Sequence, residues 1–493
     1  MSKLKQKTIQ GMAWSVAERL SLQVIHVVVS IVLARLLEPS EFGLFGMLAI
    51  FTSIAQSLLD SGFGSALIQK KNATKTDSST IFYFNLIIGI VLAGILFFSA
   101  PLIANFYRQP ILKPVTRVLS LNMVINAFSL VQLSLLKKRL DFKRHFTISI
   151  IAVIFSGLCG IIAGYLGLGV WSLVIQSLSF SLSQAVALWI LNNWRPAFDF
   201  SMESFRSMYS FGSKLLIAGL IETAFKNLYQ TFIGRTYSPS DLGYYSRSAT
   251  MESAVSVASS MAIGQVIFSA FSPFQDDNKT LKQVHSKTIR MTMFIMLPVM
   301  IGLIIIAEPL FLFLLTEKWA QSIPYFQLLC IIGVMLPIVV QNYNLLRIKG
   351  RTDLHLRLEL VKYGMTIIAI LLTYRHGIIA LILGQIAVAL ISNLIASYIS
   401  GKLINYSLID MAKDILPSAL MTLVMSAGIF LIGTLNISSN LLKFSSQIIV
   451  GIVIYYLINK LRNSQELDEI LEIIKNFITV MVAKLKGSLW KNH

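Results

Sequence analysis

Long apolar runs recur from one end of the chain to the other, and polar or charged segments separate them. Most of these runs are long enough to cross the ~30 Å hydrocarbon core of a bilayer as a helix. They lack the strict alternation of apolar and polar positions that a membrane β-barrel requires, so the pattern favours helices. We predict an all-α polytopic membrane protein with about fourteen transmembrane helices, at residues 10–36, 42–67, 81–104, 115–136, 146–166, 168–191, 209–233, 245–270, 289–315, 324–346, 356–375, 377–400, 412–434 and 441–460.

The positions of the basic residues agree with this arrangement. With the N-terminus on the inner side, thirty of the 42 Lys and Arg residues lie in or beside inner segments, seven in outer loops and five within helices. An excess of this kind marks the cytoplasmic side of a membrane protein. We therefore expect both termini to be cytoplasmic. The net charge of +19 follows mostly from this topology, which argues against a nucleic-acid partner.

The overall composition and the two chain ends fit the same class. Hydrophobic residues make up 55% of the chain and charged residues 13%, whereas about a quarter of a soluble domain is charged. The first residues, "MSKLKQKTIQGMAWS", are basic, and no small-residue cleavage site follows, so we expect a retained first helix. The segment after Lys460 has helical periodicity with charge at both ends. It is expected to form an interfacial amphipathic helix.

One short turn occurs twice, 200 residues apart. The stretch "LARLLEPSEFG" (Leu33–Gly43) matches "FIGRTYSPSDLG" (Phe232–Gly243), with Arg, Pro, Ser and Gly in the same register. Pro, a capping residue and Gly are ordinary turn chemistry, so one copy alone would carry no weight. A second echo, of an Arg-x-Asp motif, follows the fourth and tenth predicted helices. We infer an internal duplication.

Because both turns are expected on the outer face, the repeat is parallel, with its axis along the membrane normal. The simplest architecture is two six-helix lobes followed by two extra helices and a tail. The expected domains are an N-terminal lobe at 1–200, a C-terminal lobe at 201–402, two extra transmembrane helices at 403–462 and a cytoplasmic amphipathic tail at 463–493.

Several motifs give the chain a family resemblance: "GMAWSVAERL" at 11–20, "LARLLEPSEFGLFGM" at 33–47, "DSGFGSALIQKK" at 60–71, "SPSDLGYYSRS" at 238–248 and "FSAFSPFQDD" at 268–277. The chain resembles the polysaccharide-unit flippases of the multidrug/oligosaccharidyl-lipid/polysaccharide exporter superfamily. Within it, the likeness is closest to the colanic-acid, teichuronic-acid and lipopolysaccharide exporters.

The resemblance implies a flippase in a bacterial inner membrane. It would move undecaprenyl-diphosphate-linked oligosaccharide repeat units from the inner to the outer leaflet, by alternating access of the two lobes, for surface polysaccharide assembly. Membrane lipids surround such a protein, and a polysaccharide polymerase and glycosyltransferases are candidate partners.

A hydrophilic head group needs a polar path through the hydrocarbon and cations for its phosphates. Helices 1 and 7, which lead the two lobes, each offer a polar face. On helix 1, spacings of four, three and four residues place Arg19, Gln23, His26 and Ser30 together. The same offset of 200 maps this face onto helix 7, at Gly219, Thr223, Lys226 and Gln230. The expected substrate-binding residues are Arg19, Gln23, His26, Glu222, Lys226, Gln230 and Lys362.

Other roles stay open for several of these residues. Arg19 can pair with Glu18 near the interface, and His26 can be a hydrogen-bonded core residue. Glu222 can neutralise Lys226 or bind a coupling proton. Lys362 follows Glu359 by three residues, so an internal ion pair is as good an interpretation as a ligand contact.

Weaker candidates lie on helices 2, 4 and 10, where they either line the path or join helices: Gln56, Asp60, Asn122, Asn126 and the "QNYN" stretch at 341–344. The recurring Arg35 and Arg235 are expected to tie the outer turns to a neighbouring loop.

The sequence shows no catalytic constellation. It lacks a P-loop and the HExxH and GxSxG motifs, and its two cysteines have no metal-ligand spacing. We therefore expect no enzyme activity, cofactor or metal. The alternatives are cation-coupled multidrug efflux, a peptidoglycan-precursor flippase, and a membrane scaffold or enzyme of polysaccharide synthesis.

Overall fold

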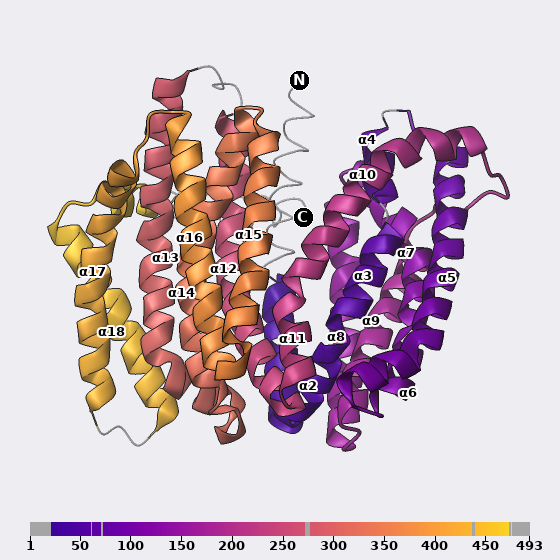
Figure 1. Ribbon diagram of the computed structural model, residues 1–493, viewed down its shortest axis with the longest axis horizontal. Helices are drawn as coiled ribbons and strands as arrows, with labels where there is room; N and C mark the ends of the chain where they lie inside the picture. The colour runs from indigo at the N-terminus through magenta and orange to yellow at the C-terminus, as the bar shows by residue number, and fades with distance from the viewer. Residues whose placement is uncertain are drawn as a thin grey trace, which may run out of the picture. The chain divides into compact units, whose positions relative to one another are not determined.

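The computed structural model describes residues 21–60, 62–70, 72–271, 277–435, 439–472 and 475; at 209–212, 214–215 and 257–271 it describes the backbone alone. Within these ranges the chain is helical and contains no strand (Figure 1). The predicted all-α class is confirmed.

The first described helix runs over Ser21–Leu36. The later helices are α2 (Pro39–Met47), α3 (Ala49–Asp60), α4 (Phe63–Gln69), α5 (Lys75–Tyr107), α6 (Leu112–Leu119), α7 (Leu121–Lys138), α8 (Phe142–Tyr165), α9 (Val170–Leu191), α10 (Met202–Lys226), α11 (Leu228–Thr236), α12 (Pro239–Phe271), α13 (Asn278–Leu315), α14 (Ser322–Ile348), α15 (Thr352–Thr373), α16 (Ile378–Lys402), α17 (Leu408–Thr434) and α18 (Asn440–Leu461), with 3₁₀ turns at Glu317–Trp319 (η2) and Tyr374–His376 (η3).

Nine helices in the described ranges are long and apolar enough to cross a membrane. A tenth candidate consists of Ser21–Leu36 and α2, which meet at a bend of 120°. The protein is therefore a multi-pass membrane protein. The predicted number of about fourteen spans is not confirmed, although each predicted range coincides with one or more helices wherever the structure describes it.

Three predicted helices are interrupted. The range 115–136 is divided at Ser120 into α6 and α7. The range 42–67 contains parts of α2, α3 and α4, and α4 begins after Gly62, whose φ of 68° ends a right-handed helix. The range 209–233 is divided at Asn227 into α10 and α11. The Asn227 side-chain amide donates a hydrogen bond to the Thr223 carbonyl oxygen at 2.8 Å. Such local side-chain hydrogen bonds compete with a continuous helical ladder.

Internal packing divides the chain into two units, Met1–Arg247 and Ser248–His493. In the first unit, α8 packs along α9, α5 along α7, and α10 against α3, α4 and α5. In the second, α13 packs against α14, α17 and α18, and α16 packs against α14 and α15. The predicted lobe and tail limits stay a prediction.

The beginning of the predicted tail is described as far as residue 472, and again at 475. Residues 465–472 are helical, and ion pairs hold them to α13 in the second unit. Lys287 Nζ lies 2.8 Å from Glu469 Oε1, and Arg290 Nε lies 3.7 Å from Glu466 Oε1. The rest of the tail lies outside the described residues.

Candidate functional site

The two copies of the repeated turn meet in the first unit. Helices α2 and α12 begin at the equivalent prolines Pro39 and Pro239. A Cβ added to Gly43 would overlap the Pro239 carbonyl oxygen, and one added to Gly243 would overlap the Pro39 carbonyl oxygen. The contact is therefore reciprocal. Only glycine permits two backbones to approach this closely.

Both helices also begin with the same capping interaction. The Glu38 N–H donates to Glu41 Oε2 at 2.8 Å, and the Ser238 N–H donates to Asp241 Oδ2 at 3.2 Å. An acidic residue three positions after the cap satisfies a backbone donor that a helix start leaves free. The duplicated sequence thus forms a duplicated local structure, and the two copies pack on each other.

A buried arginine lies two turns into α12. Only 5% of Arg247 is exposed, and its Nη1 donates a hydrogen bond to Ser30 Oγ. Its guanidinium carbon lies 5.9 Å from the centre of the Phe42 ring. Its Nε is buried and has no hydrogen-bond partner among the described residues. In that same part of the chain no carboxylate forms an ion pair with it.

Sequence reasoning did not select Arg247, because it lies near the start of the predicted helix 245–270 and counts among the seven basic residues of the outer loops. The repeated turn at Pro239 was the available signal, since α12 begins there and places Arg247 two turns inside the helix. The residue extends the predicted polar face of helix 1, because its partner Ser30 belongs to that face. The arginine of the repeated turn, Arg235, instead lies over the Phe106 ring at 5.4 Å.

The helix Ser21–Leu36 and α10, which carry most of the predicted residues, pack on different helices. Arg19 lies outside the described residues. Gln23 is half-buried, and the ring of the exposed His26 lies 6.4 Å from that of Phe180 in α9. Val29 of the same helix fills the space beside Gly157 of α8. Helix 1 therefore packs on α8 and α9, whereas α10 packs on α3, α4 and α5.

The predicted residues of α10 and α11 are accessible. Glu222 and Lys226 are exposed, and Gln230 is half-buried. No ion pair between Glu222 and Lys226 is found in the ranges that the structure describes. The hydroxyl groups of Thr223 and Ser57 lie 2.9 Å apart, which ties α10 to α3 beside this pair.

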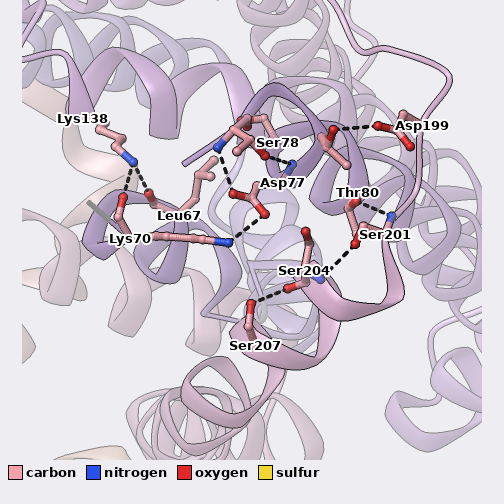
Figure 2. A network of polar contacts seen from close by, with 12 residues as sticks. Leu67, Lys70, Asp77, Ser78, Thr80, Lys138, Asp199, Ser201, Ser204 and Ser207 are labelled. Atoms are coloured by element: carbon pink, nitrogen blue, oxygen red, sulfur yellow. Dashed lines mark hydrogen bonds and ion pairs between the residues drawn. The ribbon is translucent and has the colours of Figure 1, made fainter. Parts of the chain in front are cut away.

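The start of α10 is held by a network at the ends of α4 and α5 (Figure 2). Asp77, 1% exposed, lies in the first turn of α5 and accepts a hydrogen bond from Lys70 Nζ at 2.8 Å. Thr80 accepts one from the N–H of Ser201, which caps α10, at 3.0 Å.

Lys138 of α7 completes this network (Figure 2). Its Nζ donates to the carbonyl oxygens of Leu67 and Lys70, which lie at the end of α4. A lysine at a helix C-terminus satisfies carbonyl groups that lack helical partners. The C-terminal end of the short helix α4 is thus fixed, and α4 in turn packs against α10.

The last predicted residue, Lys362, forms the ion pair with Glu359 that its spacing allows. Its Nζ lies 2.8 Å from Oε1 and 2.7 Å from Oε2 of that carboxylate. The lysine side chain is 32% exposed and the glutamate side chain 18%. The pair does not exclude a ligand, because part of the ammonium surface stays open.

The weaker polar candidates take part in hydrogen bonds between helices. The amide of Asn126 donates to Gln56 at 2.9 Å, and that of Asn122 donates to Ser177 at 2.9 Å. Gln341 donates to Thr292 at 2.8 Å. These bonds join α7 to α3 and α9, and α14 to α13. In the described ranges no group of three or more His, Cys, Asp or Glu side chains is placed to hold a metal ion.

The fold resembles solved membrane transporters. A lipid II flippase in an inward closed conformation superposes with a TM-score of 0.74 at 15% identity, over 91% of this chain and 98% of that one. An inward-facing multidrug resistance transporter of the MATE family superposes with a TM-score of 0.60 at 15% identity, over 80% and 99% of the two chains. At this identity the likeness concerns the fold alone.

Several relatives in sequence have names that refer to the biosynthesis or transport of such compounds as teichuronic acid, lipopolysaccharide and succinoglycan. The teichuronic acid biosynthesis protein of Bacillus subtilis is 26% identical, over 86% of this chain and 89% of that protein. A lipopolysaccharide biosynthesis protein of Escherichia coli is 26% identical over 81% and 82%. The succinoglycan biosynthesis transport protein of Rhizobium meliloti is 25% identical over 67% of each chain. The family model described as polysaccharide biosynthesis protein matches residues 32–324, more than half of the chain, so the chain belongs to this family.

Proposed function

We propose that this protein is a transporter, not an enzyme, and that it flips undecaprenyl-diphosphate-linked oligosaccharide repeat units from the inner to the outer leaflet of the bacterial inner membrane. The observation that carries the proposal is the family match over 32–324. Relatives named for polysaccharide biosynthesis and transport support it, as does the flippase-like fold. The product would be a unit presented for surface polysaccharide assembly, with a polymerase and glycosyltransferases as partners.

The chemistry of the head group decides which residues matter. A diphosphate needs cations, and the sugar needs polar neighbours, while the lipid tail stays in the hydrocarbon. Arg19, Lys226 and Arg247 are the cations we assign to the diphosphate in the first unit. Gln23, His26 and Gln230 supply polar lining, and Glu222 either neutralises Lys226 or takes a coupling proton.

Arg247 is the strongest of these cations on structural grounds. Burying a cation without a carboxylate partner costs several kcal/mol. A hydroxyl group and a ring face, its two described contacts, offset this cost only in part. An anionic ligand would use the free Nε. Transport would then require the outer contact of α2 and α12 to open, as alternating access demands.

The test uses a deletion strain of the source bacterium, from which lipids are extracted. A complete lipid-linked repeat unit should accumulate on the cytoplasmic leaflet, and the wild-type gene should clear it. A well-expressed Arg19→Ala/Lys226→Ala variant should clear it at least tenfold more slowly, since each charged hydrogen bond contributes about 1.5–3 kcal/mol. The control is Lys113→Ala, which removes an exposed lysine of α6 and should behave as wild type.

Two other results would contradict the proposal. Units that pile up on the outer leaflet would indicate a polymerisation defect, and thus a scaffold or an enzyme. Sensitivity to dyes with no lipid accumulation would indicate multidrug efflux.

Flipping of a peptidoglycan precursor is the second candidate, because a lipid II flippase has the TM-score of 0.74. The two functions differ in the lipid that accumulates. A pentapeptide-bearing disaccharide in the extracted lipid would identify the precursor, whereas a peptide-free oligosaccharide would identify a polysaccharide unit.

A further inference from the structure

The second unit contains a cluster of charged and phenolic groups in the middle of α15. Lys362 is the eleventh of the 22 residues of this helix. α15 packs against α14 and α16, which are both long and apolar enough to cross a membrane. At 1.5 Å per residue Lys362 lies ~15 Å from the start of α15, so we infer that it lies near the centre of a ~30 Å hydrocarbon core. Ionisable groups at this depth are costly, so their presence points to a function.

The two members of the ion pair are held unequally. The Glu359 carboxylate accepts a hydrogen bond from Lys362 Nζ at 2.8 Å, and the hydroxyl groups of Tyr343 in α14 and Tyr363 in α15 are neutral donors beside it. If Lys362 moved away, the tyrosines would still satisfy the carboxylate. The His355 ring lies 4.3 Å from the Tyr343 ring, which limits how that phenol moves.

Lys362 is held less firmly. An ammonium group has three N–H donors, and Glu359 is its one carboxylate partner in the ranges described. Its other described contact is the face of the Tyr363 ring at 5.3 Å. The lysine side chain is 32% exposed and has a flexible four-carbon stem, so its ammonium group can move to another anion. The Glu359 carboxylate would then keep the tyrosine hydroxyl groups as neighbours.

We propose that Lys362 exchanges Glu359 for a phosphate oxygen of the lipid-linked substrate, and that Glu359, held by Tyr343 and Tyr363, is the internal competitor that sets how tightly the head group binds. This inference rests on the proposed function and names a specificity-determining residue for it. A firmly held competitor keeps the site neutral when empty and lets the head group leave again after transport.

The competition makes opposite predictions for two substitutions. Glu359→Gln removes the competing anion but keeps the lysine, so a phosphorylated lipid should bind about tenfold more tightly. Tyr343→Phe removes one neutral donor from Glu359, which then holds Lys362 more strongly. The same lipid should bind about threefold more weakly. A purely structural ion pair would not make binding tighter in one variant and weaker in the other.

The experiment titrates the full-length protein in nanodiscs with undecaprenyl diphosphate, and with undecaprenol as the phosphate-free probe, by native mass spectrometry. Lys362→Gln should weaken binding of the diphosphate about tenfold, and none of the variants should change binding of undecaprenol. The matched control is Asp353→Asn on the same helix. It removes a carboxylate that lies 3.0 Å from Arg351 Nε at the exposed start of α15 and should bind as wild type.

Because Glu359→Gln leaves an unpaired lysine at membrane depth, the double variant Glu359→Gln/Lys362→Gln provides a neutral pair. It should bind undecaprenyl diphosphate as weakly as Lys362→Gln alone. Suppose that the wild type binds undecaprenyl diphosphate more tightly than undecaprenol. An unchanged or higher Kd of Glu359→Gln for the diphosphate would then overturn the role of Glu359 as competitor and leave the proposed function standing. A wild type that binds the two lipids equally well would overturn both the competitor role and the proposed function.

Discussion

At the residue scale, two cations of the described chain differ in the groups that surround them. Lys362 and Arg247 are both cations inside helices, but one has a carboxylate at 2.7 Å and the other has Ser30 and the Phe42 ring. The sequence pattern predicted the first partner, because Glu359 precedes Lys362 by three residues on one helix. It had no means to predict Ser30, which lies far from Arg247 in the chain.

Arg247 provides a test at this scale. Replacing it by Met keeps most of the side-chain volume and removes a buried charge that has no carboxylate partner. Thermal stability in detergent should stay the same or rise, by up to about 2 kcal/mol. If the guanidinium binds the head group, clearance of lipid-linked units should nevertheless fall about tenfold.

Arg235→Met is the control for this variant, because Arg235 is exposed and lies over the Phe106 ring. It should clear the units at the normal rate. Normal clearance by Arg247→Met as well would mean that Arg247 serves packing alone.

At the element scale, the repeated turn is the part of the structure that the sequence anticipated best. The register of Pro39 with Pro239 and of Gly43 with Gly243 predicted two equivalent turns. Each turn starts a helix with the same cap, but at Pro39 and Pro239 and not at the predicted positions 42 and 245. The pattern did not reveal that the two turns pack on each other. When two backbones are in contact, the glycine that permits the contact is the only sign of it in the sequence.

Gly43→Ala tests this contact. Its methyl group would overlap the Pro239 carbonyl oxygen, so α2 and α12 must separate, and the protein should lose about 1–3 kcal/mol of stability. Gly243→Ala should cost a similar amount because the contact is reciprocal. The double variant should cost less than the sum, since the first substitution already separates the turns.

Gly46→Ala is the matched control, one turn further along α2. A Cβ there would lie 3.6 Å from its nearest neighbour, a Leu242 methyl group, which is ordinary van der Waals contact. Thermal unfolding in detergent, followed by fluorescence size-exclusion, compares the variants. A Gly43→Ala protein as stable as Gly46→Ala would contradict the tight approach of the turns.

At the scale of the whole molecule, the distribution of basic residues makes a prediction about orientation. In the predicted topology, thirty Lys and Arg residues lie on the inner side and seven on the outer side, so we expect both termini in the cytoplasm. A C-terminal green fluorescent protein fusion should therefore fluoresce, and a C-terminal alkaline phosphatase fusion should be inactive. A phosphatase fusion truncated after Lys318 should be active, because that loop is expected outside. The reverse pattern would invert the topology and the proposed direction of transport.

The sequence by itself determined the class, the family and the repeat. Apolar runs of membrane length, basic loops and turn motifs are local patterns, because the bilayer imposes the same requirement on each segment separately. The same reasoning identified Lys362 with Glu359, which are neighbours on one helix.

Only the tertiary structure decided which helices share a contact. The break at Asn227, the burial of Arg247 against Ser30, the interlocked Gly43 and Gly243, and the tyrosine that α14 adds to Glu359 all join residues distant in the chain or depend on packing. Polar residues on a membrane helix signal that a partner exists, since an unpaired polar group in hydrocarbon is costly. The identity of that partner depends on which helices pack together, and local sequence patterns do not predict which helices do so.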